Sequence, residues 1–233
     1  MSTTVPPLKP GSASNARLML ARLKLRVSGH INQGLYSRKT RLGLRRDLTL
    51  PLERPSAKIP ISVRPLIQGD LDILLPQVSN DHPEALEIHW RRNFLRKAPR
   101  GCFVAVDMRD GTPCYMQWLF SAKENAVVES IGGFPRLESD EALLENAYTP
   151  PSHRGLRIMS EAMARIAEAA GPMGARYVFT FVGEENIASL KGCQRSGFHP
   201  HLLHHRSRFC FGVFRSDRFE QLSENDERRS LQF

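Results

Sequence analysis

The chain has 233 residues, a formal net charge of +9 and a hydrophobic fraction of 41%. This length suits one well-cored domain with an appendage, and without an apolar run of 18 residues we expect no transmembrane helix. The four cysteines lack the spacing of a metal site and nothing resembles a secretory signal, so we expect reduced thiols in a cytoplasmic protein.

The positive charge is concentrated near the amino terminus. Residues 1–52 contain ten Lys and Arg residues and one acid, Asp47, whereas residues 53–233 contain 23 basic and 23 acidic residues. The high isoelectric point is therefore a property of the first segment and says little about the rest of the chain.

Residues 1–58 are predicted to form a basic extension punctuated by proline and glycine. Residues 1–16 are rich in Pro, Ser and Gly, which predicts disorder. Ala16–Val27 alternates like a strand but also fits one face of a helix, and the pattern leaves both open.

The core is predicted to begin with a strand at Ile61–Pro65, followed by two helices. Asp70 is a plausible N-cap for a short helix over Leu71–Leu75. The second helix is expected over Pro83–Lys97. Its inward side is predicted to carry Leu86, His89, Trp90 and Phe94.

A hairpin follows, because the Asp-Gly pair in Arg109–Thr112 supplies the chemistry of a turn between two apolar strands. The remaining elements are predicted as strands over Cys102–Met108, Pro113–Ala122, Ala126–Ile131, Ala142–Tyr148, Ala175–Val182 and Leu202–Phe214, with helices over Leu156–Ala170 and from Asn186.

This order of elements indicates an α/β (α+β mixed) fold. We expect a central mixed, mostly antiparallel sheet of six to seven strands, flanked by helices on both faces. The predicted division is an extension over residues 1–58, a domain over residues 59–216 and a polar tail over residues 217–233.

The most informative segment is Thr149–Ser160, which joins a predicted strand to a predicted helix through an Arg-Gly turn. The first N–H groups of a helix have no intrahelical partner, and the helix dipole adds about half a positive charge there. The turn therefore predicts a binding site for a diphosphate, and with it a nucleotide-containing cofactor.

Two motifs together resemble the GNAT acyltransferase superfamily. The turn is similar to the family's acyl-CoA loop, Arg/Gln-x-x-Gly-x-Gly/Ala, with Arg154 in the first position. Asn186–Phe198 is similar to the family's late helix, which begins with Asn and ends in Gly-Phe. The resemblance covers roughly residues 59–214 and implies transfer of an acyl group from acetyl-CoA, or another acyl-CoA, to an amine.

The loop departs from the family pattern at two positions, since Arg157 and Met159 stand where small residues are usual. We expect that coenzyme A still binds, and that Gly at position 157 would preserve or improve affinity. The resemblance implies diphosphate contacts from Arg154, Gly155, Leu156, Arg157, Ile158, Met159 and Ser160, and contacts with the pantetheine arm from Tyr148, Thr149 and Asn186.

Catalytic candidates also follow from the resemblance. The family's usual general acid is a Tyr in the late helix, where this chain has Cys193, which could instead be a small packing residue. Tyr148 is the other candidate acid. Glu145, on the strand before the loop, is the candidate general base, and His89 is a weaker one.

Four histidines between His199 and His205 raise the question of a metal site. No acidic or Cys ligand accompanies them at zinc spacing, so we predict no metal and interpret them as strand-surface residues.

The sequence leaves the partners open. Both a small molecule and a protein are open as sources of the acceptor amine. Residues 1–52 suit an acyl carrier protein, RNA or another anionic surface, an organellar address or packing in a homodimer. The alternative to an N-acyltransferase is a catalytically degenerate GNAT-like domain that binds a ligand or partner.

Overall fold

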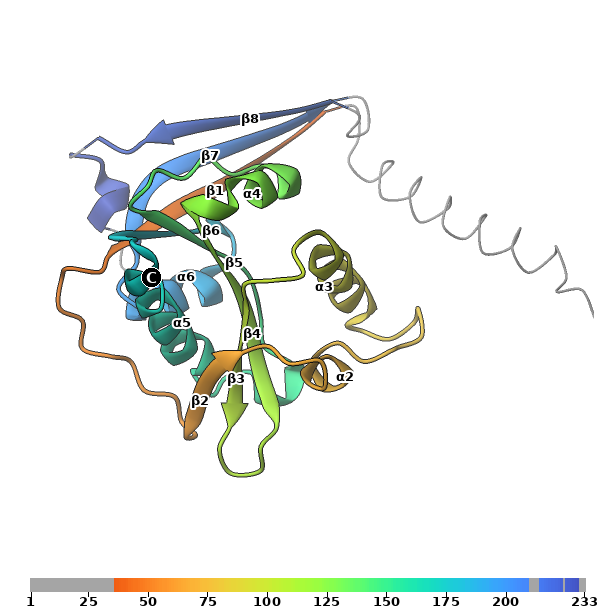
Figure 1. Cartoon of the computed structure of the whole chain (residues 1–233). Coiled ribbons are helices and arrows are strands. Elements are labelled where there is room, and N and C mark those ends of the chain that lie inside the picture. Colours follow the sequence, from red (N-terminus) through yellow and green to blue (C-terminus); the bar gives the residue numbers. More distant parts are fainter. Residues whose placement is uncertain (1–35, 210–213, 224, 231–233) are drawn as a thin grey trace, which may run out of the picture. The chain divides into compact units, whose positions relative to one another are not determined.

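The computed structural model describes residues 36–209, 214–223 and 225–230 (Figure 1). The strands are β1 (Tyr36–Asp47), β2 (Ile61–Pro65), β3 (Cys102–Asp107), β4 (Pro113–Ser121), β5 (Glu141–Tyr148), β6 (Tyr177–Gly183), β7 (His199–Phe209) and β8 (Phe214–Gln221). The α-helices are α2 (Asp70–Leu74), α3 (Ala85–Lys97), α4 (Asn125–Ile131), α5 (Ile158–Glu168) and α6 (Ile187–Arg195), with 3₁₀ turns at Ala122–Glu124, Pro151–His153, Gly171–Met173 and Glu227–Ser230. The predictions for residues 1–16 and Ala16–Val27 lie outside the described residues.

The chain divides into two compact units, and the larger one contains the candidate site. Of the described residues, it comprises 40–205, 218–223 and 225–230, and the smaller unit comprises 36–39, 206–209 and 214–217. Within the smaller unit, the rings of Tyr36 and Phe209 lie 5.0 Å apart and Asp217 pairs with Arg206 at 2.9 Å.

The sheet has eight strands in the order β2-β3-β4-β5-β6-β1-β7-β8, and most neighbouring pairs whose register is known are antiparallel. This confirms the predicted fold class, with one or two more strands than expected. In Figure 1, α5 and α6 lie on one side of the strands β3–β5, and α2 and α3 lie on the other.

Strand β4 shows why the sheet carries helices on both faces. All nine of its residues are buried. Tyr115 and Leu119 pack in the core under α5 and α6, whereas Met116, Trp118 and Phe120 pack in the core under α2, α3 and α4. Alternating side chains point to opposite faces of a strand, so a strand that is apolar throughout needs cover on both sides.

Strand β1 corrects the expectation that the core begins at Ile61. It pairs with β6 along Arg41–Asp47, and Leu42 and Leu44 are 2% and 1% exposed. We interpreted Gly43 as loop punctuation, but it marks a close approach, since a Cβ there would lie 2.5 Å from Leu202 Cδ1. The division drawn at residue 58 stays a prediction, although a strand of the sheet precedes it.

The inward face predicted for α3 is correct for Phe94, which packs against Trp118, but wrong for its other three residues. Leu86 and Trp90 are 75% and 65% exposed and His89 is exposed, whereas Ile88 and Arg91 are buried. Both stripes of this helix have helical spacing, so periodicity alone could not choose between them.

Two further elements differ from prediction. Residues 125–131 form helix α4 instead of a strand, because Ser121 and Glu124 form a capping box in front of it and Val128 is buried. The predicted tail contributes β8, whose charged side chains suit an edge strand but hide the apolar alternation that identifies one.

Asp70 is the first residue of α2 and not its N-cap, which is Gly69. Its carboxylate accepts hydrogen bonds from Arg64 and from the Ile67 N–H. These contacts, Arg64 first, hold the pKa of Asp70 below its usual value.

Candidate functional site

The candidate site begins where two neighbouring strands part. β5 pairs in parallel with β6 only from Glu141 to Leu143, while it stays paired with β4 as far as Tyr148. β6 instead remains paired with β1 up to Gly183. The carboxyl-terminal half of β5 therefore has backbone groups facing β6 without a strand to receive them, which suits an extended ligand.

A bulge lies in this half of β5. The register with β4 shifts between Trp118, which faces Glu145, and Met116, which faces Tyr148. Asn146 takes up the extra residue with a left-handed φ of 59°. Both polar atoms of its side-chain amide are buried and have no hydrogen-bond partner among the residues that the structure describes. A buried amide without a partner is costly, so this position is suited to a polar ligand group.

The predicted diphosphate loop follows β5 directly. Gly155 and Arg157 have φ of 79° and 59°, and α5 begins at Ile158. Arg157 thus adopts the left-handed conformation that the family's glycine would give, at a cost of roughly 1 kcal/mol. Its side chain is exposed and has no ion-pair partner among the described residues. The N-terminus of α5 therefore keeps the backbone shape of an anion cradle despite the departure in sequence.

The second departure is accommodated by packing. Met159 is the second residue of α5, and its side chain contacts Gly192 of α6. A Cβ on Gly192 would be 3.1 Å from the Met159 sulfur. Ser160 is 2% exposed, and its carbonyl accepts a hydrogen bond from Ser196 Oγ at 2.8 Å. Met159 therefore fills the space that Gly192 leaves open.

Arg154 connects the loop to the start of α3. Its guanidinium pairs with Glu84 through two contacts, the shorter 2.5 Å, and donates to the Thr149 carbonyl at 3.1 Å. Arg154 is the first cause of the lowered pKa of Glu84. A diphosphate contact by this arginine would compete with Glu84.

Tyr148 ends β5 beneath a buried guanidinium. The Arg91 guanidinium lies 4.4 Å from the Tyr148 ring centroid and donates to the Ala147 carbonyl at 3.0 Å. Arg91 is 7% exposed and pairs with Glu87, while its Nε has no hydrogen-bond partner in the described part of the chain. The Tyr148 hydroxyl donates to Glu84 at 3.4 Å, and burial, followed by the Glu84 charge, raises the pKa of Tyr148. This phenol therefore stays protonated at neutral pH.

Glu145 faces an arginine of β1. Arg41 Nη2 lies 3.4 Å from both Glu145 carboxylate oxygens and donates to the Phe181 carbonyl at 2.8 Å. The same guanidinium lies 5.4 Å from the Phe134 ring centroid. Arg41 thus reaches from β1 across β6 to β5, over the place where the strands part.

Cys193 is fully enclosed on α6. It is 0% exposed, and burial, with a smaller effect of Glu145, raises the pKa of its thiol to about 12. Asn186 is exposed as the N-cap of α6 and accepts a hydrogen bond from the Ser189 N–H at 3.1 Å. Tyr148, Thr149 and residues 154–160 lie along one segment that runs from the end of β5 into α5. The roles predicted for these residues, and for Glu145, Cys193 and Asn186, stay predictions.

Sequence reasoning missed Glu84, Arg91, Asn146 and Arg41. A carboxylate just before a helix gives Glu84 a weak signal, whereas the others depend on helix rotation, a bulge and an unexpected strand. The histidines do not converge: His204 is buried and stacks on Phe219 at 4.6 Å, whereas His199 is exposed. Within the described ranges, no group of three His, Cys, Asp or Glu residues could hold a metal ion.

Comparison with known proteins decides the family. A sequence model of the Acetyltransferase (GNAT) family matches residues 71–198, more than half of the chain. The chain belongs to this family. No curated protein matches the sequence well enough to count as a relative. Among the helices that the structure describes, none is long and apolar enough to cross a membrane.

Several solved structures resemble this chain at low sequence identity. A glucosamine N-acetyltransferase region of a fungal multi-domain GH3 β-N-acetylglucosaminidase matches with a TM-score of 0.52 and 12% identity, over 93% of this chain and 24% of that chain. A tandem GNAT protein from the clavulanic acid biosynthesis pathway gives 0.47 and 16%, over 84% and 57% of the two chains. A GNAT-family acetyltransferase from Colwellia psychrerythraea gives 0.45 and 14%, over 80% and 57%. The chain therefore spans less than two thirds of the length of each of these structures.

Proposed function

We propose that this GNAT-family chain moves an acetyl or other acyl group from coenzyme A to a primary amine, by direct attack in a ternary complex. The observation that supports this most is the parting of β5 from β6 directly before the left-handed turn at the N-terminus of α5. It joins an open strand edge to an anion cradle, which together suit a pantetheine arm and its diphosphate. When bound, the thioester supplies the activated acyl group.

The chain's own residues would hold the donor along this segment. Backbone N–H groups of residues 155–159 and the Arg154 guanidinium suit the diphosphate, and the Asn146 amide suits a polar group of the arm. Tyr148 and Thr149 would line the arm, and Asn186 would approach it from α6. Holding the two reactants in contact is a large part of what such a reaction needs.

Proton transfer would use Glu145 and Tyr148. Glu145 lies 3.4 Å from Arg41 Nη2, and a carboxylate can take a proton from an amine directly or through one water. Tyr148 stays protonated and lies at the end of β5. Cys193, enclosed and with a raised pKa, suits packing better than acid catalysis.

The first test is calorimetric titration of the full chain with coenzyme A and acetyl-CoA. Arg154→Ala should weaken both about tenfold, since it removes a charged ligand of the diphosphate. Glu84→Gln is the matched control: it frees Arg154, so affinity should be retained or improved. Absence of binding to both ligands would contradict the donor site.

The second test is release of free coenzyme A from acetyl-CoA in the presence of an amine panel. The panel includes amino acids, polyamines, lysine peptides and glucosamine, the last because one structure of the same fold is described as a glucosamine N-acetyltransferase region. Binding without turnover on the whole panel would favour the alternative, a degenerate domain that binds a ligand or partner.

Three further proposals concern the molecules that this chain contacts. A small-molecule or protein amine as acceptor, an acyl carrier protein or anionic surface bound through residues 1–52, and a homodimer are separate proposals, each with its own binding or sedimentation measurement. A cytoplasmic location belongs with them.

A further inference from the structure

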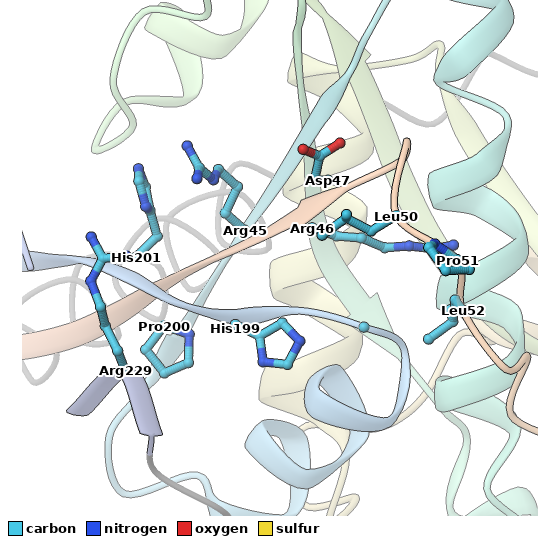
Figure 2. Close-up of a pocket in the computed structure, with 11 residues that line it drawn as sticks. Arg45, Arg46, Asp47, Leu50, Pro51, Leu52, His199, Pro200, His201 and Arg229 are labelled. Carbon is cyan, nitrogen blue, oxygen red and sulfur yellow. The ribbon is translucent and has the colours of Figure 1, made fainter. Parts of the chain in front are cut away.

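A basic pocket lies at the end of β1 and the start of β7, away from the open half of β5. Its volume is about 250 Å³, and it is lined by Arg45, Arg46, Asp47, Leu50, Pro51, Leu52, Gly197, His199, Pro200, His201 and Arg229 (Figure 2). All of these residues belong to the larger unit. β5 starts near the pocket, where its first residue, Glu141, pairs with Tyr177 of β6. Its eight residues then run to the diphosphate loop at the opposite end of the strand. The two sites are therefore about a strand length, roughly 25 Å, apart.

Two guanidiniums in this pocket have no acidic partner among the described residues. Arg45 lies over the Tyr177 ring, with 4.5 Å between its guanidinium carbon and the ring centroid. Arg229 uses Nε and Nη2 to donate to the Leu222 carbonyl at 3.2 and 2.6 Å. A guanidinium has five N–H donors, so both residues keep donors for a further acceptor.

The other charges of the lining are already compensated. Arg46 donates to the Ala164 carbonyl at 3.0 Å and pairs with Glu168 at 3.2 Å. Asp47 pairs with Arg176 at 3.0 Å. The net charge that the pocket presents therefore comes from Arg45 and Arg229.

His201 lies between these two cations. Figure 2 shows the nitrogen-bearing ends of Arg45 and Arg229 on either side of the His201 ring. Burial, then Arg45 and Arg229, lower the pKa of His201 to about 4. The ring is therefore neutral at pH 7, with one N–H to donate, and the two arginines add to the effect of burial on its pKa.

We propose that this pocket binds a compact oxyanion of the phosphate class between Arg45 and Arg229, with His201 as a third donor. Planar guanidiniums match the oxygen spacing of phosphate, and three donors from β1, β7 and the carboxyl-terminal 3₁₀ turn suit a tetrahedral anion. The shared chemistry is that of inorganic phosphate and of the terminal group of a phosphomonoester. The inference does not depend on the acyl-transfer proposal.

The test follows the His201 ring resonance of the full chain by NMR, assigned with His201→Gln. Inorganic phosphate at pH 7 should shift this resonance saturably. Sulfate, whose charge is constant over the range, should raise the His201 pKa, because a bound anion favours the protonated ring. Absence of a saturable shift, or an unchanged pKa in sulfate, would overturn the proposal.

Matched variants separate the pocket from general charge. Arg45→Gln and Arg229→Gln should each weaken phosphate binding roughly tenfold. Arg54→Gln, which removes an exposed cation paired with Glu168, should leave it unchanged. Equal affinities in all three variants would contradict the assignment.

Two further experiments identify the source of the anion and test whether the pocket is separate from the cofactor site. Glycerol 2-phosphate that displaces inorganic phosphate with higher affinity would indicate a phosphomonoester, and weaker displacement would indicate the free ion. Arg154→Ala should leave phosphate binding at His201 intact. A parallel loss of phosphate and coenzyme A binding in that variant would show a single site and overturn the inference.

Discussion

Arg157 shows that a loop can keep its shape after losing the residue that usually gives it. Its backbone is left-handed, with φ 59° and ψ 18°, although a side chain makes this conformation cost roughly 1 kcal/mol. The helix that begins at the next residue, Ile158, is buried along most of its length, so packing holds the turn in place.

We therefore expect Arg157→Gly to change the free energy of unfolding by less than about 1 kcal/mol, because relief of strain and added freedom of the unfolded chain oppose each other. Arg157→Val should destabilise by about 1–2 kcal/mol more, since a branched side chain is disfavoured at this φ. Urea unfolding of the two variants measures the difference. Coenzyme A affinity should be retained in Arg157→Gly, and a tenfold loss would instead show that the guanidinium is a ligand.

Arg91 is a buried charge on a helix that leaves Leu86 and Trp90 exposed. Burying a cation while apolar side chains face solvent is unfavourable for stability alone, which makes the position a candidate for function. Its guanidinium pairs with Glu87, one turn earlier on α3, and also contacts the Ala147 carbonyl and the Tyr148 ring, both at the open end of β5. We interpret Arg91 as a positioning residue for this segment.

Arg91→Met should therefore lower kcat at least tenfold while changing stability little, because methionine fills a similar space and the Glu87 carboxylate that loses its partner is 52% exposed to solvent. The profile of kcat against pH should shift with it, since Arg91 lowers the pKa of Tyr148 and its loss removes that effect. Ile88→Val, on the same buried face, is the control for packing. Equal losses of activity and of stability in both variants would indicate a structural role only.

At the scale of elements, the predictable parts were those with strong local chemistry. The Asp-Gly hairpin, the strand before the loop and the Asn-capped late helix lie where the sequence placed them. Strand β1 was missed because its Leu42 and Leu44 alternate with arginines around a glycine, which is also the pattern of a basic linker. Its place in the sheet depends on β6 and β7, more than 120 residues away, and no local pattern carries that information.

The part of the candidate site that local sequence encodes was predictable, and the part that depends on the sheet was not. The segment 148–160 is continuous in sequence, so its motif sufficed. Asn146 can be recognised as a site residue only from the bulge in β5, and Arg41 only from the order of the strands in the sheet. Both depend on long-range pairing.

Gly43 tests the interpretation of β1 directly. A Cβ there would lie 2.5 Å from Leu202 Cδ1 and 2.9 Å from Phe181 Cε1, so Gly43→Val should destabilise by about 2–3 kcal/mol through overpacking. Gly69→Ala is the control, because a Cβ at Gly69 meets nothing within 4 Å. Thermal unfolding compares them. A similar melting temperature in the two variants would mean that β1 does not lie between β6 and β7.

At the scale of the whole molecule, the basic amino-terminal region has two parts. Five of its ten Lys and Arg residues lie in β1, where Arg41 pairs with Glu145 and Arg46 with Glu168. Half of the charge that suggested an anionic partner thus belongs to the sheet. An anionic partner of residues 1–52 is better tested by replacing the five basic residues of 1–35 with Gln than by deleting the region.

Two truncations follow from this division. A chain that begins at residue 36 keeps β1 and should unfold cooperatively in urea, because every strand of the described sheet remains. A chain that begins at residue 54 loses the burial of Leu42 and Leu44, each worth about 1.5–3 kcal/mol, and separates β6 from β7. Since a domain of this size is stable by only about 5–15 kcal/mol, the shorter chain should lack a cooperative transition. Circular dichroism during unfolding distinguishes the two. Cooperative unfolding of both chains at the same urea concentration would show that β1 is dispensable and return the core to a start at Ile61.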